Sequence, residues 1–199
     1  MISPWINGRM PSEEDYINDM FIKLLCDKLK KFHKLTCDRI LNPFYDIHMR
    51  IDLCKKRNIL LPYYIDHILK KLDILKYTLS NTKNIGLCHN DLNPSNIIIS
   101  KNNLYFIDFE YSAMNDIFWD LASISWFLDF TNRKKLLTEY FGNYKKEYMK
   151  KLLDYLYIVK LHNASWSLLK CNNSDSKYDY YKGALMIFED LLNHNIFIK

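Results

Sequence analysis

Only four glycines occur among the 199 residues, and no two of them lie close together: Gly8, Gly86, Gly142 and Gly183. Loops that cradle nucleotide phosphates are rich in glycine, because the backbone must approach the phosphates closely. The chain has no such loop, and no strand that carries a phosphate-binding lysine can be recognised in it. We therefore do not expect this chain to hold a nucleotide by a glycine-rich loop of its own.

Cysteines that could build a disulfide framework or a zinc site are also lacking. The five cysteines are odd in number and scattered, and none forms a C-x-x-C pair: Cys26, Cys37, Cys54, Cys88 and Cys171. This pattern favours reduced thiols in a cytoplasmic protein.

Long apolar runs and blocks of one charge are missing as well. No apolar stretch reaches the roughly 18 residues that a membrane-spanning helix needs, and the N-terminus does not resemble a signal peptide. The net charge is +5, but lysines and acidic residues are interspersed along most of the chain. We expect no membrane span and no nucleic-acid partner, only a mild preference for ligands that carry phosphate.

Apolar and aromatic residues are abundant, at 49% and 15% of the chain, as in a folded globular protein. The length suffices for one substantial core or one lobe of a larger enzyme. Apolar residues at helical spacing predict helices over residues 13–34, 62–80, 116–130, 146–170 and 177–193, with a shorter one that follows a loop at 42–44 and ends near Lys56. Ser12 and Asp15 resemble a capping box at the first helix, and Pro62 suits the first turn of another.

One stretch has a pattern of functional residues rather than a pattern of core residues. His89, Asp91 and Asn96 follow the pattern H-x-D-x-x-x-x-N, which matches the catalytic loop of protein kinases and their relatives. Two short β-prone runs come next, 97–99 and 104–107, and a polar stretch with turn-forming asparagines separates them. They predict a β-hairpin with a loop of two or three residues.

The register of this hairpin brings oxygen ligands together. Counting back along the antiparallel ladder places Asn96 opposite Asp108 or one step from it, with Asp91 on the loop that leads in. An amide oxygen and a carboxylate in this arrangement suit Mg²⁺, which completes its shell with water and substrate phosphates. Asp91 could then receive a proton from a substrate hydroxyl, as in phosphoryl transfer by kinases.

The wider sequence around the motif resembles the choline/ethanolamine kinase family, with bacterial choline kinases as the nearest match. The resemblance rests on His89-Asn90-Asp91 with Asn96, on Ile107-Asp108-Phe109-Glu110-Tyr111, on Met114-Asn115-Asp116 and on Trp119-Asp120-Leu121-Ala122. Protein kinases have Gly where Glu110 stands, so the sequence favours the kinases of small alcohols, which belong to the wider aminoglycoside-phosphotransferase-like group.

The resemblance implies an α+β, mainly α fold: the C-terminal lobe of a protein-kinase-like enzyme, with a small β-hairpin at the catalytic loop. Residues 1–12 resemble the hinge between two lobes, and residues 13–199 would form the substrate and catalytic lobe, without the N-terminal nucleotide lobe. A separate chain that supplies this lobe, or a homo-oligomer, is an open alternative.

The resemblance also bears on three residues in or near the motif. His89 could act as an acid or base, but in kinase-like loops this position normally braces the backbone, and we favour that role. Asn93 is a candidate contact for the metal or the transferred phosphate. Asp120 would be costly in a buried helix unless it is hydrogen-bonded, and the resemblance implies that it steadies the catalytic loop.

A quaternary ammonium group cannot donate hydrogen bonds, so its binding depends on aromatic faces and nearby carboxylates. The candidates for this pocket are Glu110, Tyr111, Trp119, Trp126, Trp166 and Tyr181. Trp166 matches the leading tryptophan of a helix that lines the choline site in the family, whereas Leu169 stands where a second tryptophan would. Tyr180 is an alternative to Tyr181. The opposing interpretation is that these rings are ordinary core, and for Trp119 and Trp126 the two readings are evenly balanced.

The expected function is an ATP- and Mg²⁺-dependent transfer of phosphate to the hydroxyl of a small amino alcohol, with choline favoured. Ethanolamine or an aminoglycoside is an alternative acceptor. A second hypothesis is a catalytically inactive fragment or pseudokinase-like binding protein, because phosphoryl transfer depends on positioning by both lobes.

Overall fold

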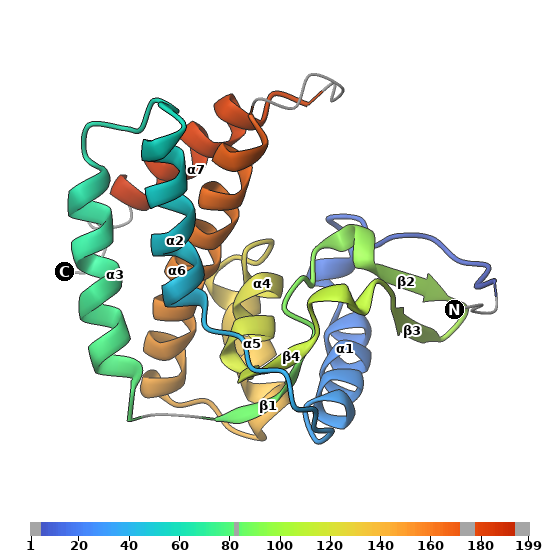
Figure 1. The fold of residues 1–199 in the computed structure, drawn as a ribbon. Helices are drawn as coiled ribbons and strands as arrows, with labels where there is room; N and C mark the ends of the chain where they lie inside the picture. Colours follow the sequence, from blue (N-terminus) through green and yellow to red (C-terminus); the bar gives the residue numbers. More distant parts are fainter. Residues whose placement is uncertain (1–4, 82–83, 172–177, 194–199) are drawn as a thin grey trace. The chain divides into compact units, whose positions relative to one another are not determined.

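The structure is a computed structural model that describes residues 5–81, 84–171 and 178–193 (Figure 1). The chain divides into two compact units, residues 1–41 with 84–156 and residues 42–83 with 157–199. We describe each unit by itself. The mainly helical α+β fold with small sheets agrees with the fold class that the sequence predicts. The domain boundary at residue 12 stays a prediction.

The first unit begins with a 3₁₀ turn, Asp15–Ile17, followed by helix α1, Asp19–Phe32. The predicted single helix over 13–34 is therefore too long at its N-terminal end. Ser12 does donate to the Asp15 carboxylate, from its backbone N–H at 2.7 Å and its hydroxyl at 3.0 Å, but these bonds close the 3₁₀ turn. The cap of α1 is Asn18, whose side-chain oxygen accepts two N–H bonds from the first turn of the helix.

The predicted hairpin is present. Strand β2, Ile97–Ser100, pairs with strand β3, Asn103–Phe106, in antiparallel register with Ile97 opposite Phe106. The loop has two residues, and Lys101 adopts a left-handed conformation with φ of 54°. An isolated bridge between Arg9 and Ile99 adds a short third segment beside β2.

A second antiparallel pair was not predicted. Strand β1, Ile85–Cys88, pairs with strand β4, Ala113–Asp116, with Cys88 opposite Ala113. Neither strand is rich in the β-branched and aromatic residues that favour strands, so the sequence carries little local signal for them. The pairing matters for the site, because it brings the backbone just before His89 beside the backbone just after Tyr111.

Two helices, not one, occupy the region after β4. Helix α4 spans Phe118–Ser125 and helix α5 spans Phe130–Phe141, so the prediction of one helix over 116–130 is wrong at both ends. Asp116 ends the strand and accepts the N–H of Phe118 at 3.0 Å, and Lys151 pairs with the same carboxylate at 2.7 Å. Asp129 begins α5 by accepting an N–H bond from Asn132.

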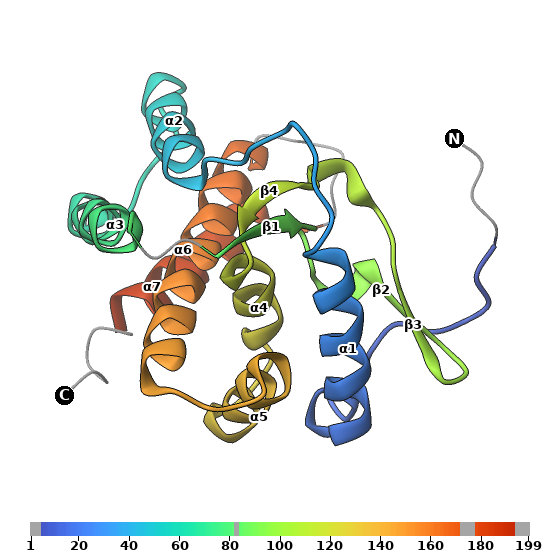
Figure 2. The same cartoon turned by 90° about the horizontal axis from the view of Figure 1, so that it is seen from below.

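The core of the first unit lies where α1 meets α5 and the strands. Helix α1 contacts α5, β1 and β3, and Figure 2 shows it beside α5. All eight residues of α4 are buried, as its apolar character predicts, and Phe118 and Trp119 are among the largest fully buried side chains. This core supports the loop that follows β1.

The second unit is helical in its described part. It contains α2 (Pro43–Lys56), α3 (Ile65–Leu79), the part of α6 (Lys146–Lys170) that follows residue 156, and α7 (Tyr180–Asn193). The prediction for α6 is confirmed at both ends, and α2 ends at Lys56 as predicted. Pro62 precedes α3 rather than lying in its first turn. The predicted start of the last helix at residue 177 lies outside the described residues.

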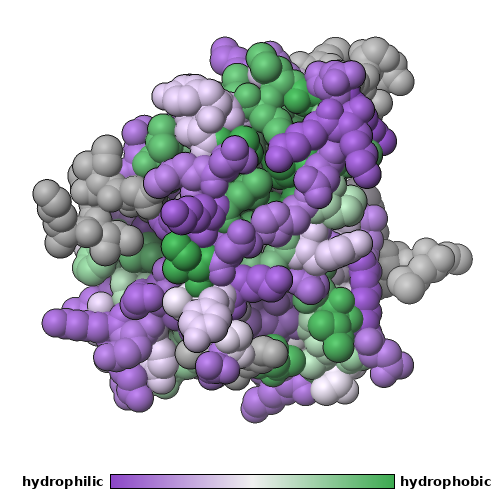
Figure 3. All heavy atoms as spheres, turned by 60° about the vertical axis from the view of Figure 1, so that its left-hand side comes forward, coloured by the Kyte–Doolittle hydropathy of each residue, from purple (hydrophilic) through white to green (hydrophobic). Residues whose placement is uncertain are grey.

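Polar contacts join the helices of the second unit. Tyr157 of α6 donates its hydroxyl to the Ile68 carbonyl of α3 at 3.1 Å, and Lys160 pairs with Asp190 of α7 at 2.5 Å. Hydrophilic side chains spread over the face drawn in Figure 3, with hydrophobic ones between them. Within the described residues, no helix has the length and apolar character needed to cross a membrane.

Gly86 in β1 offers a test of this packing. A Cβ atom there would lie 2.5 Å from the His33 carbonyl oxygen and 2.9 Å from a methyl carbon of Ile117. Because a backbone atom would have to move, Gly86→Ala should lower the free energy of unfolding by about 2 kcal/mol, as overpacking does. Urea denaturation of the purified chain measures the change.

Gly183→Ala in α7 is the matched control. The three atoms nearest to its new Cβ all belong to the end of the Tyr178 side chain, an exposed residue, and none is a backbone atom. In a helix interior, alanine is also more favourable than glycine by about 1 kcal/mol of helix stability. Equal losses for the two variants would contradict the packing described for β1.

Candidate active site

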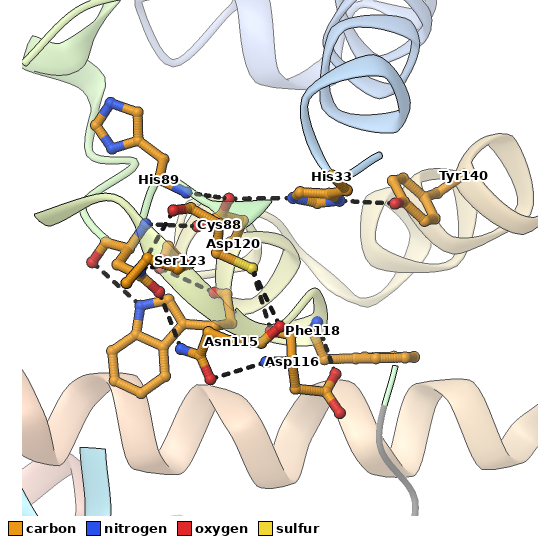
Figure 4. Close-up of polar contacts among 12 residues, drawn as sticks. His33, Cys88, His89, Asn115, Asp116, Phe118, Asp120, Ser123 and Tyr140 are labelled. Carbon is orange, nitrogen blue, oxygen red and sulfur yellow. Dashed lines mark hydrogen bonds and ion pairs between the residues drawn. The ribbon is translucent and has the colours of Figure 1, made fainter. Parts of the chain in front are cut away.

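The loop between β1 and β2 is shaped by a buried carboxylate beneath it. Asp120 of α4 is fully buried, and its two oxygens accept the backbone N–H groups of His89 at 2.8 Å and Asn90 at 2.9 Å (Figure 4). Two successive amides bonded to one carboxylate hold the loop backbone in one conformation. This geometry suits the steadying role that the family resemblance implies for Asp120.

The same carboxylate is tied to two other helices. His33, directly after α1, lies with its Nε2 3.1 Å from an Asp120 oxygen, and its Nδ1 lies 2.7 Å from the Tyr140 hydroxyl of α5. Figure 4 shows Asp120, His33 and Tyr140 in a row. Three donors around Asp120 offset the cost of burying its charge, which would otherwise be several kcal/mol. Neither His33 nor Tyr140 is among the residues that the sequence predicts for the site.

His33, Cys88 and Asp120 also form a group whose potential ligand atoms all lie within 4.8 Å of one another. The bonds already made argue against a metal ion there. Asp120 is engaged by the three donors, and the Cys88 thiol points at the carbonyl oxygens of Asn115 and Asp116. Burial, and then the charge of Asp120, raise the pKa of the Cys88 thiol far above its usual range, so it stays protonated and is a poor ligand.

The contacts of His89 suit the bracing role that we favoured for it. Its ring is fully buried, and its Nε2 lies 2.8 Å from the carbonyl oxygen of Ile107, the residue before Asp108. The ring also packs 5.0 Å from that of Phe109. His89 therefore connects the loop to the segment that carries Asp108.

Three polar residues of the motif lie together on the loop. Asn96 donates its amide N–H to the Asp91 carboxylate at 2.9 Å and to the Asp91 carbonyl at 2.8 Å, and Asn93 donates to the other carboxylate oxygen at 3.2 Å. Burial raises the pKa of Asp91, and the neighbouring charge of Asp108 adds to this effect. The two amide donors and His89 act in the opposite direction and only partly offset it.

Asp108 lies one step beyond Asn96 across the hairpin, as the spacing predicts. Ile107 donates its N–H to the Asn96 carbonyl at 3.1 Å, and Asp108 follows in a left-handed conformation with φ of 62°. Asp108 is exposed. Asn96 directs its amide nitrogen at Asp91, so its side-chain oxygen is the atom that can face a cation. An amide oxygen and a carboxylate are hard donors, and they fit Mg²⁺.

The candidates for the ammonium pocket differ in exposure. Glu110 and Tyr111 are exposed on the short turn after Asp108. Trp126, at the end of α4, is part-buried. Trp119 is only 1% exposed and donates its indole N–H to the Asn90 carbonyl at 3.1 Å, so here its ring supports the loop from within the core. These four residues belong to the first unit.

Trp166 and Tyr181 belong to the second unit, and both are part-buried. The ring of Trp166 meets that of Tyr180 edge to face, with centroids 5.8 Å apart, and Lys170 places its ammonium 5.4 Å from the centroid of the Trp166 ring. The alternative Tyr180 is therefore the tyrosine in contact with Trp166. A cation over this ring shows that its face can accept positive charge.

Solved structures of kinases share the fold of this chain. The choline/ethanolamine kinase family protein from Mesorhizobium loti superposes with a TM-score of 0.87, at 20% identity, over 96% of this chain and 68% of that one. Choline kinase LicA from Streptococcus pneumoniae gives 0.77 at 21% identity, over 94% and 68% of the two chains. A structure of LicA has been solved in complex with AMP. These likenesses show the fold.

The chain belongs to the phosphotransferase enzyme family, whose model matches residues 3–155. "Probable choline kinase 3" of Arabidopsis thaliana is 30% identical over 130 residues, which cover 61% of this chain and 37% of that protein. The chain thus spans little more than a third of the length of this relative.

The role of Asp120 can be tested by its removal. Asp120→Ala leaves three buried donors without their acceptor, so the free energy of unfolding should fall by about 3–5 kcal/mol. Asp27→Ala, an exposed aspartate in α1, is the control and should stay within about 0.5 kcal/mol of the parent. Urea denaturation gives both values, and a loss below 1 kcal/mol for Asp120→Ala would refute its role as the support of the loop.

Proposed function

We propose that this chain carries the phosphoryl-transfer site of an ATP-dependent kinase for a small amino alcohol, with choline as the favoured acceptor. The observation that carries the proposal is the cluster of Asp91, Asn93 and Asn96 on one loop, with Asp108 next to it across the hairpin. The family membership supports the reaction class, and the choline kinases among the relatives support the acceptor.

In this proposal Asp91 orients the substrate hydroxyl and takes its proton as the hydroxyl oxygen bonds to the γ-phosphorus. The bond between that phosphorus and the β–γ bridging oxygen breaks, and ADP leaves. Asn96 and Asp108 would hold Mg²⁺, which would supply positive charge to offset the negative charge of the phosphates. Asn93 lies beside Asp91 and can meet the transferred phosphate through its amide. The bonds from Asn93 and Asn96 also fix the direction of the Asp91 carboxylate, so that it needs no reorganisation during the reaction.

The nucleotide requires a second binding element, because the chain has no glycine-rich loop. We propose that the described residues act as the C-terminal lobe and that residues 1–12 form the hinge. The bridge between Arg9 and Ile99, with N–O distances of 3.0 and 2.8 Å, supports this by joining that segment to the hairpin next to the loop. The nucleotide lobe would come from another polypeptide segment, and the alternative is a binding protein that transfers no phosphate.

For the ammonium group of the acceptor, we propose Trp166 as the main aromatic contact. Its contacts with Tyr180 and with the Lys170 ammonium support the choice. Glu110 and Tyr111, exposed beyond Asp108, remain candidates for the same headgroup, as do Trp126 and Tyr181. We assign Trp119 to the support of the loop, because its ring is buried and its indole N–H is used.

Replacing the proposed base tests the function directly. In transfer of labelled γ-phosphate from ATP to choline, Asp91→Asn should lower the rate at least about a hundredfold, the usual contribution of a general base. Because burial raises the pKa of Asp91, the parent should lose activity on acidification at a pH above the usual carboxyl range near 3.9. Asp27→Asn, on an exposed aspartate, should leave the rate unchanged.

The acceptors choline, ethanolamine and an aminoglycoside are compared in the same assay. No labelled product from any of them, with or without an added nucleotide lobe, would favour the binding-protein alternative. Undiminished transfer by Asp91→Asn would remove Asp91 from the mechanism while leaving the reaction class intact.

Substitution of Trp166 tests the headgroup contact. Trp166→Ala should raise KM for choline about tenfold, because a desolvated cation–π contact is worth about 1–2 kcal/mol, while KM for ATP stays within twofold. Trp166→Phe keeps an aromatic face and should retain most of the affinity. Equal changes in both KM values would indicate that Trp166 only packs the core.

A further inference from the structure

Asn90, the residue before Asp91, makes many hydrogen bonds, and those of its backbone come first. It is 8% exposed, and its backbone adopts a left-handed conformation with φ of 67°. Its N–H donates to Asp120, and its carbonyl accepts the indole N–H of Trp119. Both backbone polar groups are therefore used to fix the loop.

The side chain of Asn90 makes a second set of bonds, which lead to a different segment. Its amide nitrogen donates to the carbonyl oxygens of Tyr111 at 3.0 Å, Cys88 at 3.2 Å and Ala113 at 3.3 Å. Its side-chain oxygen accepts an N–H from Asn115 at 2.9 Å. The side-chain oxygen of Asn115, which is labelled in Figure 4, accepts the backbone N–H of Asp116 at 2.8 Å.

The backbone conformation alone does not explain an asparagine here. Glycine adopts a left-handed conformation more easily than any other residue, and aspartate tolerates it as well. Only the amide, however, supplies both donors for the three carbonyls and an acceptor for Asn115. An aspartate would direct a carboxylate oxygen at carbonyl oxygens, and a glycine would leave the Asn115 amide without this acceptor.

These bonds connect the two halves of the proposed site. Asn90 is covalently next to Asp91, and Tyr111 follows Asp108 by three residues on the segment that also carries Glu110. We propose that Asn90 is a positioning residue whose side-chain amide fixes the 108–113 segment, with its metal-binding carboxylate, relative to the Asp91 loop. The inference rests on the proposed function for the roles of Asp91 and Asp108, but the connection itself does not.

Asn90→Gly separates the side chain from the backbone, because glycine keeps the left-handed conformation. Asn58→Gly is the matched control: Asn58 is an exposed asparagine with φ of 53°, beyond the end of α2. Amide hydrogen exchange of the whole 199-residue chain, followed by mass spectrometry, should show the peptide covering 107–114 exchanging at least tenfold faster in Asn90→Gly. Exchange in α5, and in the Asn58→Gly chain, should match the parent.

Steady-state kinetics on the same chains distinguishes a positioning role of Asn90 from a purely structural one. The assay includes any nucleotide lobe that the parent chain needs. Asn90→Gly should lower kcat at least tenfold while KM for ATP and for choline stay within twofold. A faster-exchanging segment with an unchanged kcat would overturn the positioning role. Unchanged exchange would overturn the connection itself, whatever the activity.

Asn115→Ala is the second variant, for use if Asn90→Gly does not fold. It removes the partner of the Asn90 side-chain oxygen and leaves the three carbonyl bonds, so the same peptide should exchange faster, by a smaller factor. No change in that peptide would again overturn the proposal. A parent chain without phosphoryl transfer would count against the proposed function, while the exchange comparison still decides whether Asn90 fixes the segment.

Discussion

The arrangement of the site depends on one buried carboxylate. Asp120 has no exposed surface, and it is stable there because backbone amides of His89 and Asn90 and the ring of His33 all direct donors at it. A charge in this position cannot be left partly satisfied, because the cost of an unpaired buried carboxylate would be several kcal/mol. The loop must therefore keep the conformation that brings its amides to Asp120. This conformation fixes the position of Asp91, the next residue along the chain.

Around this anchor, two short β-pairs align the candidate site residues. The β2–β3 hairpin fixes the register of Asn96 against the residue before Asp108, and the β1–β4 pair brings the following segment back beside the loop. Side chains then join these elements: His89 bonds to Ile107, and Asn90 to Tyr111 and Ala113. The site is thus held by many modest hydrogen bonds in a buried setting, where each is costly to lose.

The sequence predicted the parts of this site that depend on short-range order. The motif from His89 to Asn96, together with the two short apolar runs after it, was enough to place Asn96 near Asp108. The helical spacing of apolar residues predicted both ends of α6. The pairing of β1 with β4 could not be predicted, because it joins two weak strands with 24 residues between them. The sequence does carry signals for the two ends of helix α5. Asp129 caps its start, and Gly142 follows its end, where the backbone has a φ of 79°. The roles of His33 and Asn90 appear only once distant residues are brought together.

The central claim is that Asn96 and Asp108 form one cation site next to Asp91, and binding of Mn²⁺ as a substitute for Mg²⁺ tests it most directly. Titration followed by electron paramagnetic resonance should show one bound Mn²⁺ per chain, with affinity reduced at least about tenfold in Asn96→Ala and in Asp108→Asn while both variants stay folded. Binding that is absent from the parent, or unchanged in both folded variants, would contradict the account.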